Sequence, residues 1–302
     1  MTLLRQTLHP ANLRRAWNDV ATNGGVAGVD EITIPVWRRS WEARLVALAD
    51  AVRHSRYRPQ PLRRRRIPKT TPGEWRTLHI PTVTDRVLQR AILQQLQPLF
   101  EPRFLDCSYG YRPGRGVHDA VRQINRLRRQ GFVYVLDADI DDFFNQVDQP
   151  LLLEMLTASL PDQSLLPLIR QLLQQARPAP NRAKGIPMGS PLSPLLANVL
   201  LHRFDQAIVP RYPLIRYADD FIILARSDDA IEDAFRLMER SLAQLKLQIE
   251  PRKTEITSFA AGFDFLGVHF AETWYWYRLN EQRIEIHDGQ EDPHIAHYDP
   301  NY

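Results

Sequence analysis

The sequence is poor in several features, and each absence limits what the protein can be. Cys107 is the only cysteine in 302 residues, which excludes an internal disulfide framework and suits a reducing compartment. No run of about 18 apolar residues occurs, so we expect no membrane span. The first residues lack the apolar stretch of a secretory signal, and we expect a cytoplasmic protein.

Acidic residues are scarce in the first part of the chain and abundant in the second. Residues 1–135 hold 24 Lys and Arg against 10 Asp and Glu, a balance of +14, whereas residues 136–302 hold 15 against 25, a balance of −10. A basic part beside an acidic, metal-capable part suits an enzyme that handles a polyanion. The basic run Arg63-Arg64-Arg65-Arg66 and the helically spaced Arg122, Arg126 and Arg129 are candidates for nucleic-acid contact. A solvated surface is the alternative interpretation of both sets.

Two adjacent carboxylates stand at the tip of a predicted β-hairpin. Residues 215–217 and 221–225 have the apolar character of two strands, and Asp219-Asp220 lie between them. Unpaired buried carboxylates repel each other, and a divalent cation would offset that charge. A solvated turn is the simpler interpretation of such a pair, and Asp141-Asp142 and Asp228-Asp229 show that pairs recur in this chain.

A third carboxylate has a matching context further upstream. Residues 132–136 form a predicted buried strand, and Asp139 follows where that strand ends. If the two segments are neighbouring strands, Asp139 would meet Asp219 and Asp220, and three carboxylates could bind the two ions that assist an in-line phosphoryl transfer. Asp137 is the alternative candidate in the same segment.

The remaining periodicity predicts an α+β protein with an antiparallel sheet and helices packed on one face. Apolar spacing predicts helices over residues 3–20, 85–99, 161–176, 192–208 and 231–245. The Arg- and Pro-rich residues 54–82 predict extended strands with a turn at 71–73. Residues 274–277 predict either a strand or a stacking surface, and residues 287–302 a polar tail or linker.

Several ordered blocks make the chain resemble bacterial reverse transcriptases of the group II intron class. The blocks occur in the family's order and cover about residues 10–270, and they are Asn23-Gly24-Gly25-Val26-Ala27-Gly28-Val29-Asp30, Ile67-Pro68-Lys69, Ser108-Tyr109-Gly110-Tyr111-Arg112-Pro113-Gly114-Arg115, the Asp139-Ile140 segment with Phe143-Phe144, Gly185-Ile186-Pro187-Met188-Gly189-Ser190-Pro191-Leu192-Ser193-Pro194, Tyr217-Ala218-Asp219-Asp220 and Phe265-Leu266-Gly267.

This resemblance implies the fold and the chemistry of a right-hand polymerase with palm and fingers. It implies an N-terminal helical extension over 1–50, basic fingers over 51–135, a palm over 136–270 and a C-terminal tail or thumb-linker remnant over 271–302. Asp139, Asp219 and Asp220 would be catalytic, and with the Ile140 carbonyl they would hold two Mg²⁺, or Mn²⁺ in their place. Asp220 supporting only the hairpin is the alternative.

The resemblance also assigns contacts to substrates and nucleic acid. The deoxynucleoside triphosphate would contact Lys69, Arg76, Phe144, Gly189 and Lys253. Phe144 would face the ribose. Template and primer would contact Arg63, Arg64, Arg65, Arg66, Arg112, Arg115, Phe265 and Gly267. Surface charge for the basic residues and an apolar core for Phe143 and Phe144 are the alternatives. Met188 departs from the family, which often has Gln there, and this affects local polar contacts.

The implied function is RNA-directed DNA synthesis on a primer with an RNA template. The family's thumb and maturase region is not recognisable after Gly267, so we expect a truncated intron protein, a partner that supplies the thumb, or a relative that works with a CRISPR spacer-acquisition integrase. A catalytically idle RNA-binding subunit of a mobile-element or phage-defence system, and a template-independent transferase, are the alternative functions.

Overall fold

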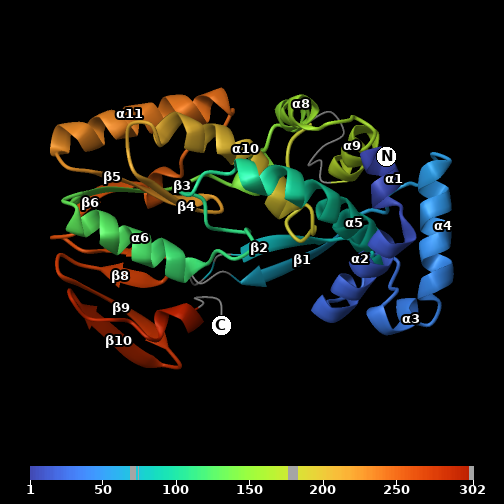
Figure 1. Ribbon diagram of the computed structural model, residues 1–302, viewed down its shortest axis with the longest axis horizontal. Coiled ribbons are helices and arrows are strands. Elements are labelled where there is room, and N and C mark those ends of the chain that lie inside the picture. Colours follow the sequence, from blue (N-terminus) through green and yellow to red (C-terminus); the bar gives the residue numbers. More distant parts are fainter. Residues whose placement is uncertain (69–72, 74, 176–182, 299–302) are drawn as a thin grey trace. The chain divides into compact units, whose positions relative to one another are not determined.

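The computed structural model describes residues 1–68, 73, 75–175 and 183–298, and it divides the chain into two compact units (Figure 1). The first unit comprises Met1–Arg103 and Phe144–Val199, and the second comprises Phe104–Phe143 and Leu200–Tyr302. Each unit therefore combines two separate stretches of sequence, unlike the four consecutive parts expected from the resemblance, and that four-part division stays a prediction.

The first unit is mainly helical. Its helices are α1 Leu3–Thr7, α2 Pro10–Asn23, α3 Ile34–Arg38, α4 Trp41–Arg53, α5 Val83–Phe100, the 3-10 helix η1 Glu101–Arg103, α8 Gln149–Ser159 and α9 Leu166–Gln174, and its strands are β1 Arg63–Pro68 and β2 Trp75–Ile80. Two further helices, α7 Phe143–Gln146 and α10 Ser193–Ile208, run across the boundary between the units.

Helix α5 is the centre of the first unit. The predicted apolar stripe of this helix, represented by Val87, Leu88 and Ile92, is fully buried, and α1 and α2 pack on it. The helix begins at Val83 because Thr82 caps it, with the hydroxyl oxygen accepting a hydrogen bond from the Asp85 amide at 3.1 Å. The single helix expected over residues 3–20 is divided in two, because Pro10 lacks an amide proton and starts a new helix.

The second unit contains two antiparallel sheets. The central sheet has the order β4-β5-β3-β6, and the C-terminal sheet has the order β10-β9-β8-β7. The strands are β3 Tyr134–Asp139, β4 Leu214–Tyr217, β5 Asp220–Ala225, β6 Glu255–Ser258, β7 Phe263–Phe265, β8 Val268–Phe270, β9 Trp274–Leu279 and β10 Gln282–His287, and the helices are α6 Val117–Arg129, α11 Asp228–Gln244, η2 Pro251–Lys253 and η3 Ile295–His297.

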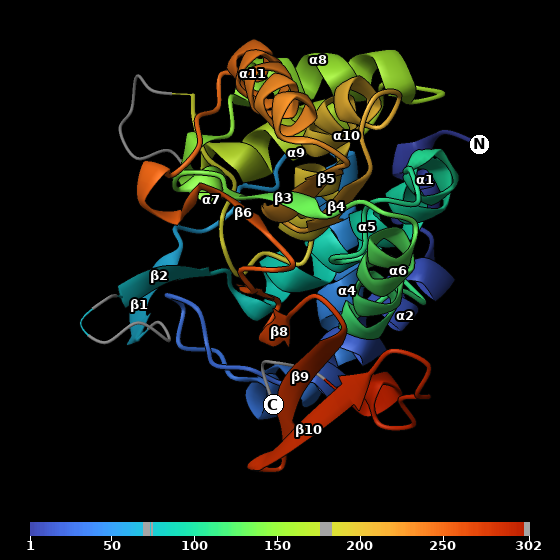
Figure 2. The ribbon, with the colours of Figure 1, turned by 90° about the vertical axis from the view of Figure 1, so that its left-hand side faces the viewer.

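Strand alternation decides what covers each face of the central sheet. On one face Phe221 of β5 packs against Phe204 of α10, and α11 lies along β3 and β5 (Figure 1). On the other face Ile222 and Leu224 join one hydrophobic core with α6 and the C-terminal sheet, and α6 lies on the opposite side from α11 in both views (Figures 1 and 2). The expected α+β class is confirmed, and the structure adds this second covering layer.

Residues 271–302, expected as a tail or linker, contain β9, β10 and η3. The strands form because Tyr275, Tyr277 and Ile286 are buried in the core that α6 shares. None of the helices in the described ranges combines the length and apolar character needed to cross a bilayer.

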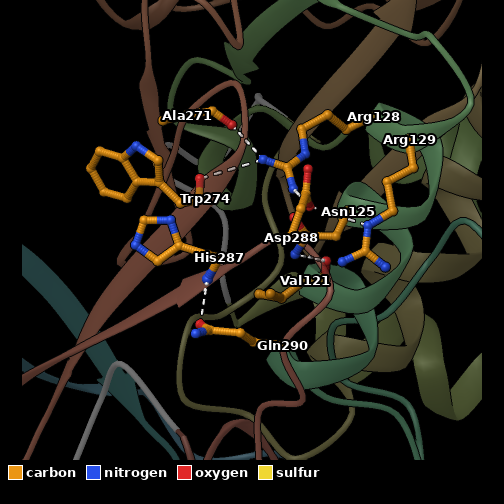
Figure 3. A network of polar contacts seen from close by, with 9 residues as sticks. All are labelled: Val121, Asn125, Arg128, Arg129, Ala271, Trp274, His287, Asp288 and Gln290. Carbon is orange, nitrogen blue, oxygen red and sulfur yellow. Dashed lines mark hydrogen bonds and ion pairs between the residues drawn. The ribbon is translucent and has the colours of Figure 1, made fainter.

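A polar network fastens the C-terminal sheet to α6 (Figure 3). The buried guanidinium of Arg128 donates to the Ala271 carbonyl at 2.6 Å and pairs with the Asp288 carboxylate. Arg129 also reaches Asp288, with Nε donating at 3.2 Å, but its side chain is half exposed. Arg128 therefore carries the contacts that hold the turn before β9 and the end of β10.

We expect Arg128→Met to lower the free energy of unfolding by about 2 kcal/mol, because it removes a buried donor from the Ala271 carbonyl and from Asp288. Arg129→Met removes only the half-exposed ion pair with Asp288 and should lower the free energy of unfolding by less than about 1 kcal/mol. Urea unfolding of both variants measures the difference, and equal losses would contradict the assignment.

Candidate active site

The acidic residues predicted from the sequence meet at one end of the central sheet. Tyr217 of β4 pairs with Asp220 of β5, so Ala218 and Asp219 form the two-residue turn between these strands. Asp220 in turn lies opposite Asp139 of β3 in the antiparallel register. Residues directly opposite each other point to the same face, so the expected meeting of Asp139 with the Asp219-Asp220 turn is found.

The pKa values of three carboxylates in this cluster are raised, so ionising all of them at once is unfavourable. Burial raises the pKa of Asp219 to about 6, and the charge of Asp139 adds to the shift. Burial also raises the pKa of Asp220 well above its usual value, followed by repulsion from Asp137, Asp139 and Asp219. The pKa of Asp137 rises to about 7 through burial and then through repulsion from Glu255. The site is therefore short of positive charge.

Lys253 supplies one positive charge to this cluster. Its ammonium group forms an ion pair with the Asp139 carboxylate, although the two residues are 114 positions apart. The backbone beside Ile140 is fixed by two hydrogen bonds, from the Glu250 amide to the Asp139 carbonyl at 2.8 Å and from the Asp141 amide to the Gln248 carbonyl at 3.0 Å. In the ranges that the structure describes, no three His, Cys, Asp or Glu side chains converge as a ready metal site.

A buried ion pair supports the turn that carries Asp219. Arg216 and Asp205 are both fully buried, and two nitrogens of the guanidinium donate to the two carboxylate oxygens at 2.7 and 2.6 Å. The same guanidinium donates to the Ala218 carbonyl at 2.8 Å and to the Ser108 hydroxyl at 2.9 Å. A bidentate Arg–carboxylate pair has a fixed geometry, so Arg216 positions the turn.

The turn also requires a glycine beneath it. Ala218 has φ of 61°, a left-handed conformation that is uncommon for residues other than glycine. A Cβ on Gly110 would lie 2.4 Å from the Ala218 amide nitrogen, so no side chain fits there. The Tyr109 amide donates to the Arg216 carbonyl at 2.8 Å, which holds this loop against β4. The sequence motif around Gly110 thus forms a backing for the acidic turn.

The predicted hairpin at residues 265–267 is present in the C-terminal sheet. Phe265 pairs with Val268, and the two residues between them, Leu266 and Gly267, have φ of 53° and 73°, as a two-residue hairpin turn requires. The Tyr298 hydroxyl donates to the Gly267 carbonyl at 2.9 Å. Phe265 itself is buried, whereas Gly267 in the turn is exposed.

Arg112 and Arg115 have different surroundings. Arg112 is buried and donates to the carbonyls of Leu105 and Ser108 at 2.7 and 2.8 Å, contacts that order its own loop. Arg115 is more accessible and forms an ion pair with the exposed Asp106. Of the two predicted nucleic-acid contacts, Arg115 has the more suitable position.

The other predicted site residues belong to the first unit. Arg63, Arg64, Arg65 and Arg66 are exposed along β1, and the exposed Arg76 of β2 lies opposite Ile67. Lys69 lies outside the described residues. Phe144 is buried.

The loop of residues 185–192, just before α10, contacts β2 through its backbone. Gly189 has φ of 111°, and a Cβ there would lie 2.9 Å from the His79 carbonyl oxygen. The His79 amide donates to the Met188 carbonyl at 2.7 Å. The glycine thus allows a close approach that a side chain would prevent.

Sequence reasoning missed three residues that shape the second unit, namely Asp205, Arg216 and Tyr298. Arg216 had a usable signal, because a charged residue inside an apolar strand requires a buried partner. Nothing local to Asp205 or Tyr298 indicated the contacts that they make.

Comparison with known proteins agrees with this geometry. The reverse transcriptase (RNA-dependent DNA polymerase) family matches residues 67–270. Protein YkfC of Escherichia coli K12 is 30% identical over 88% of this chain and 81% of its own length. The group II intron-encoded protein LtrA of Lactococcus lactis subsp. cremoris is 30% identical over 68% of this chain, which spans 35% of LtrA. A solved telomerase from Candida tropicalis has a TM-score of 0.55 at 12% identity, covering 78% of this chain and 52% of its own, a likeness of fold alone.

The chain belongs to the reverse transcriptase family, whose members are RNA-dependent DNA polymerases. The resemblance to the group II intron class is confirmed by these relatives.

We expect Arg216→Met to lower the free energy of unfolding by about 3–5 kcal/mol, because it leaves the Asp205 carboxylate buried and unpaired. Arg236→Met, which removes the surface ion pair with Asp233, should cost less than about 1 kcal/mol. Chemical denaturation compares them, and a small loss for Arg216→Met would contradict its supporting role.

The raised pKa values predict an unusual dependence of stability on pH. The folded protein holds protons on Asp137 and Asp219 that the unfolded chain releases near pH 4, so the free energy of unfolding should fall as pH rises from about 4 to about 7. Without divalent ions, Asp137→Asn should therefore stabilise the protein at pH 8 by about 1–2 kcal/mol, with little gain at pH 4. Thermal melts of this variant at both pH values measure the change in stability, with Asp228→Asn at an exposed position as control. Equal stability of Asp137→Asn and the wild-type protein at pH 8 would contradict the unfavourable ionisation of Asp137 in the folded protein.

Proposed function

We propose that this protein is an RNA-directed DNA polymerase that adds deoxynucleotides to the 3′ end of a primer by phosphoryl transfer assisted by two divalent ions. The observation that carries the proposal is the meeting of Asp139, Asp219 and Asp220 at one end of the central sheet. Such a cluster serves no purpose in stabilising the fold, because its members repel one another.

The donor set fits Mg²⁺, with Mn²⁺ as a substitute. The side chains offer only oxygen ligands, and Asp139 and Asp220 are direct neighbours across β3 and β5. Cations would relieve the repulsion that raises the pKa of Asp219 and Asp220. With the Ile140 carbonyl these three residues would hold the ions. Bound there, the ions would lower the pKa of the primer hydroxyl and stabilise charge on the leaving pyrophosphate.

Lys253 has a second role in this proposal. Its ammonium group pairs with the Asp139 carboxylate, and it would be available to a triphosphate if a cation took its place beside that carboxylate. A flexible ammonium is suited to binding phosphate oxygens and to donating a proton to departing pyrophosphate.

The resemblance assigns the remaining contacts to residues whose positions lie in the first unit. Arg76 and Lys69 would bind the triphosphate, because guanidinium and ammonium groups pair with phosphate oxygens. Gly189 would support the incoming base pair, and Phe144 would exclude a ribose 2′-hydroxyl. The arginines of β1 would bind the phosphates of the template backbone. Their exposure along the strand supports this role.

The deciding experiment is primer extension on an RNA template with a DNA primer, deoxynucleotides and Mg²⁺. We expect template-dependent extension that falls at least about 100-fold in the Asp219→Asn/Asp220→Asn variant, because the ions lose their ligands. The matched control is Asp228→Asn/Asp229→Asn, which changes an exposed acidic pair in the first turn of α11 in the same unit. This variant should extend the primer as the wild-type protein does.

Extension without template would indicate a terminal transferase instead. No extension with either Mg²⁺ or Mn²⁺, together with tight RNA binding, would indicate a catalytically idle RNA-binding protein.

A further inference from the structure

The outer face of the C-terminal sheet carries an unusual group of side chains. Tyr275 and Tyr277 of β9 point into the core, so the alternating residues Trp274 and Trp276 lie on the opposite face. A sheet face that only meets water needs polar residues there. Two neighbouring tryptophans on that face are therefore not explained by folding.

Basic and imidazole groups surround the two indole rings. The guanidinium carbon of Arg283 lies 4.6 Å from the ring centroid of Trp276 and 5.6 Å from that of Trp274. The His269 ring lies 5.8 and 5.9 Å from the same two indoles, and His287 lies 6.4 Å from Trp274. We call these five side chains the aromatic platform.

The platform rests on a rigid support. Arg128 holds the Ala271 carbonyl at the start of the β8–β9 turn, and the rings of Trp274 and His287 lie on the side of the strands away from Arg128 (Figure 3). The hydroxyl groups of Tyr275 and Tyr277 donate to Asp292, each at 2.8 Å, on the opposite side of β9. The indoles are therefore presented on a fixed strand rather than on a loop.

Positive charge is concentrated at one end of the platform. Arg278 and Arg283 are exposed and lie directly opposite each other across β9 and β10, where like charges repel. On the same face Glu285 accepts from Arg283 at 2.7 Å and from His287 at 3.0 Å, and Asp264 contacts His269 at 3.0 Å. One carboxylate, Glu285, therefore offsets part of the charge of the two arginines. A phosphate group would suit the Arg278–Arg283 end.

The spacing of the indoles selects unpaired bases. Residues two positions apart on a strand are separated by about 6.7 Å, whereas stacked bases of a duplex strand are about 3.4 Å apart. Each indole could therefore stack one base of an extended strand, but not successive bases of a duplex. Aromatic side chains on four-stranded sheets bind single-stranded RNA in this manner.

We propose that the aromatic platform is a binding site for single-stranded nucleic acid, with Trp274 and Trp276 stacking successive bases and Arg278 and Arg283 contacting the backbone. None of its five side chains is among the residues predicted to bind template, primer or nucleotide, and binding there needs no catalysis. It would bind a single strand even if the chain did not extend a primer.

The test is fluorescence anisotropy of a labelled uridine oligonucleotide with the full-length protein, without nucleotides. Trp276→Leu and Trp274→Leu should each weaken binding about 10-fold, because each removes one base stack. Arg283→Gln should weaken it about threefold. The control is Trp41→Leu in the first unit, whose indole is likewise partly covered by an arginine, with Arg14 at 5.4 Å, and this variant should bind normally.

A blunt RNA–DNA duplex should bind the wild-type protein and both tryptophan variants equally, because its bases are paired and stacked on one another. Unchanged binding of the oligonucleotide by both tryptophan variants, or an equal loss for the duplex, would overturn the proposal. Photocrosslinking of a thiouridine oligonucleotide to the wild-type protein tests it without a variant. Crosslinks within residues 269–287 are expected, and crosslinks found only elsewhere would refute it.

Discussion

The ion pair between Arg216 and Asp205 is the interaction on which the candidate active site depends. It is fully buried, and the same guanidinium binds the carbonyl of the turn residue Ala218 and the hydroxyl of Ser108. One side chain thus joins α10, β4 and the loop before α6. A charge this deeply buried is tolerated only with a complete set of partners, so the turn has a single allowed position.

The carboxylates beside that turn show the opposite principle. Asp137, Asp219 and Asp220 are placed where burial and mutual repulsion raise their pKa, which weakens the apo protein at neutral pH. Proteins keep such arrangements where function needs concentrated charge. The Arg216–Asp205 ion pair therefore holds the turn in place, although the carboxylates of Asp219 and Asp220 are repelled by their acidic neighbours.

The C-terminal sheet extends this frame into a second surface. Its inner face completes the core that α6 shares with β3 and β5, and its outer face presents the aromatic platform. Under the proposal, one set of strands serves both stability and binding, because alternate residues point to opposite faces. Along β9 the buried residues Tyr275 and Tyr277 alternate with the partly exposed Trp274 and Trp276.

The sequence by itself determined the family, the order of its motifs and the local elements around them. The hairpin at Asp219-Asp220 and the helix of residues 83–100 follow from apolar spacing and capping, which act over a few residues. Only the tertiary structure decided that Asp139 lies opposite Asp220, that Arg216 binds Asp205, and that β10 Gln282–His287 pairs with the strand expected around residues 274–277. These features depend on pairing and burial between distant segments, and no local pattern encodes which distant segment will pack against which.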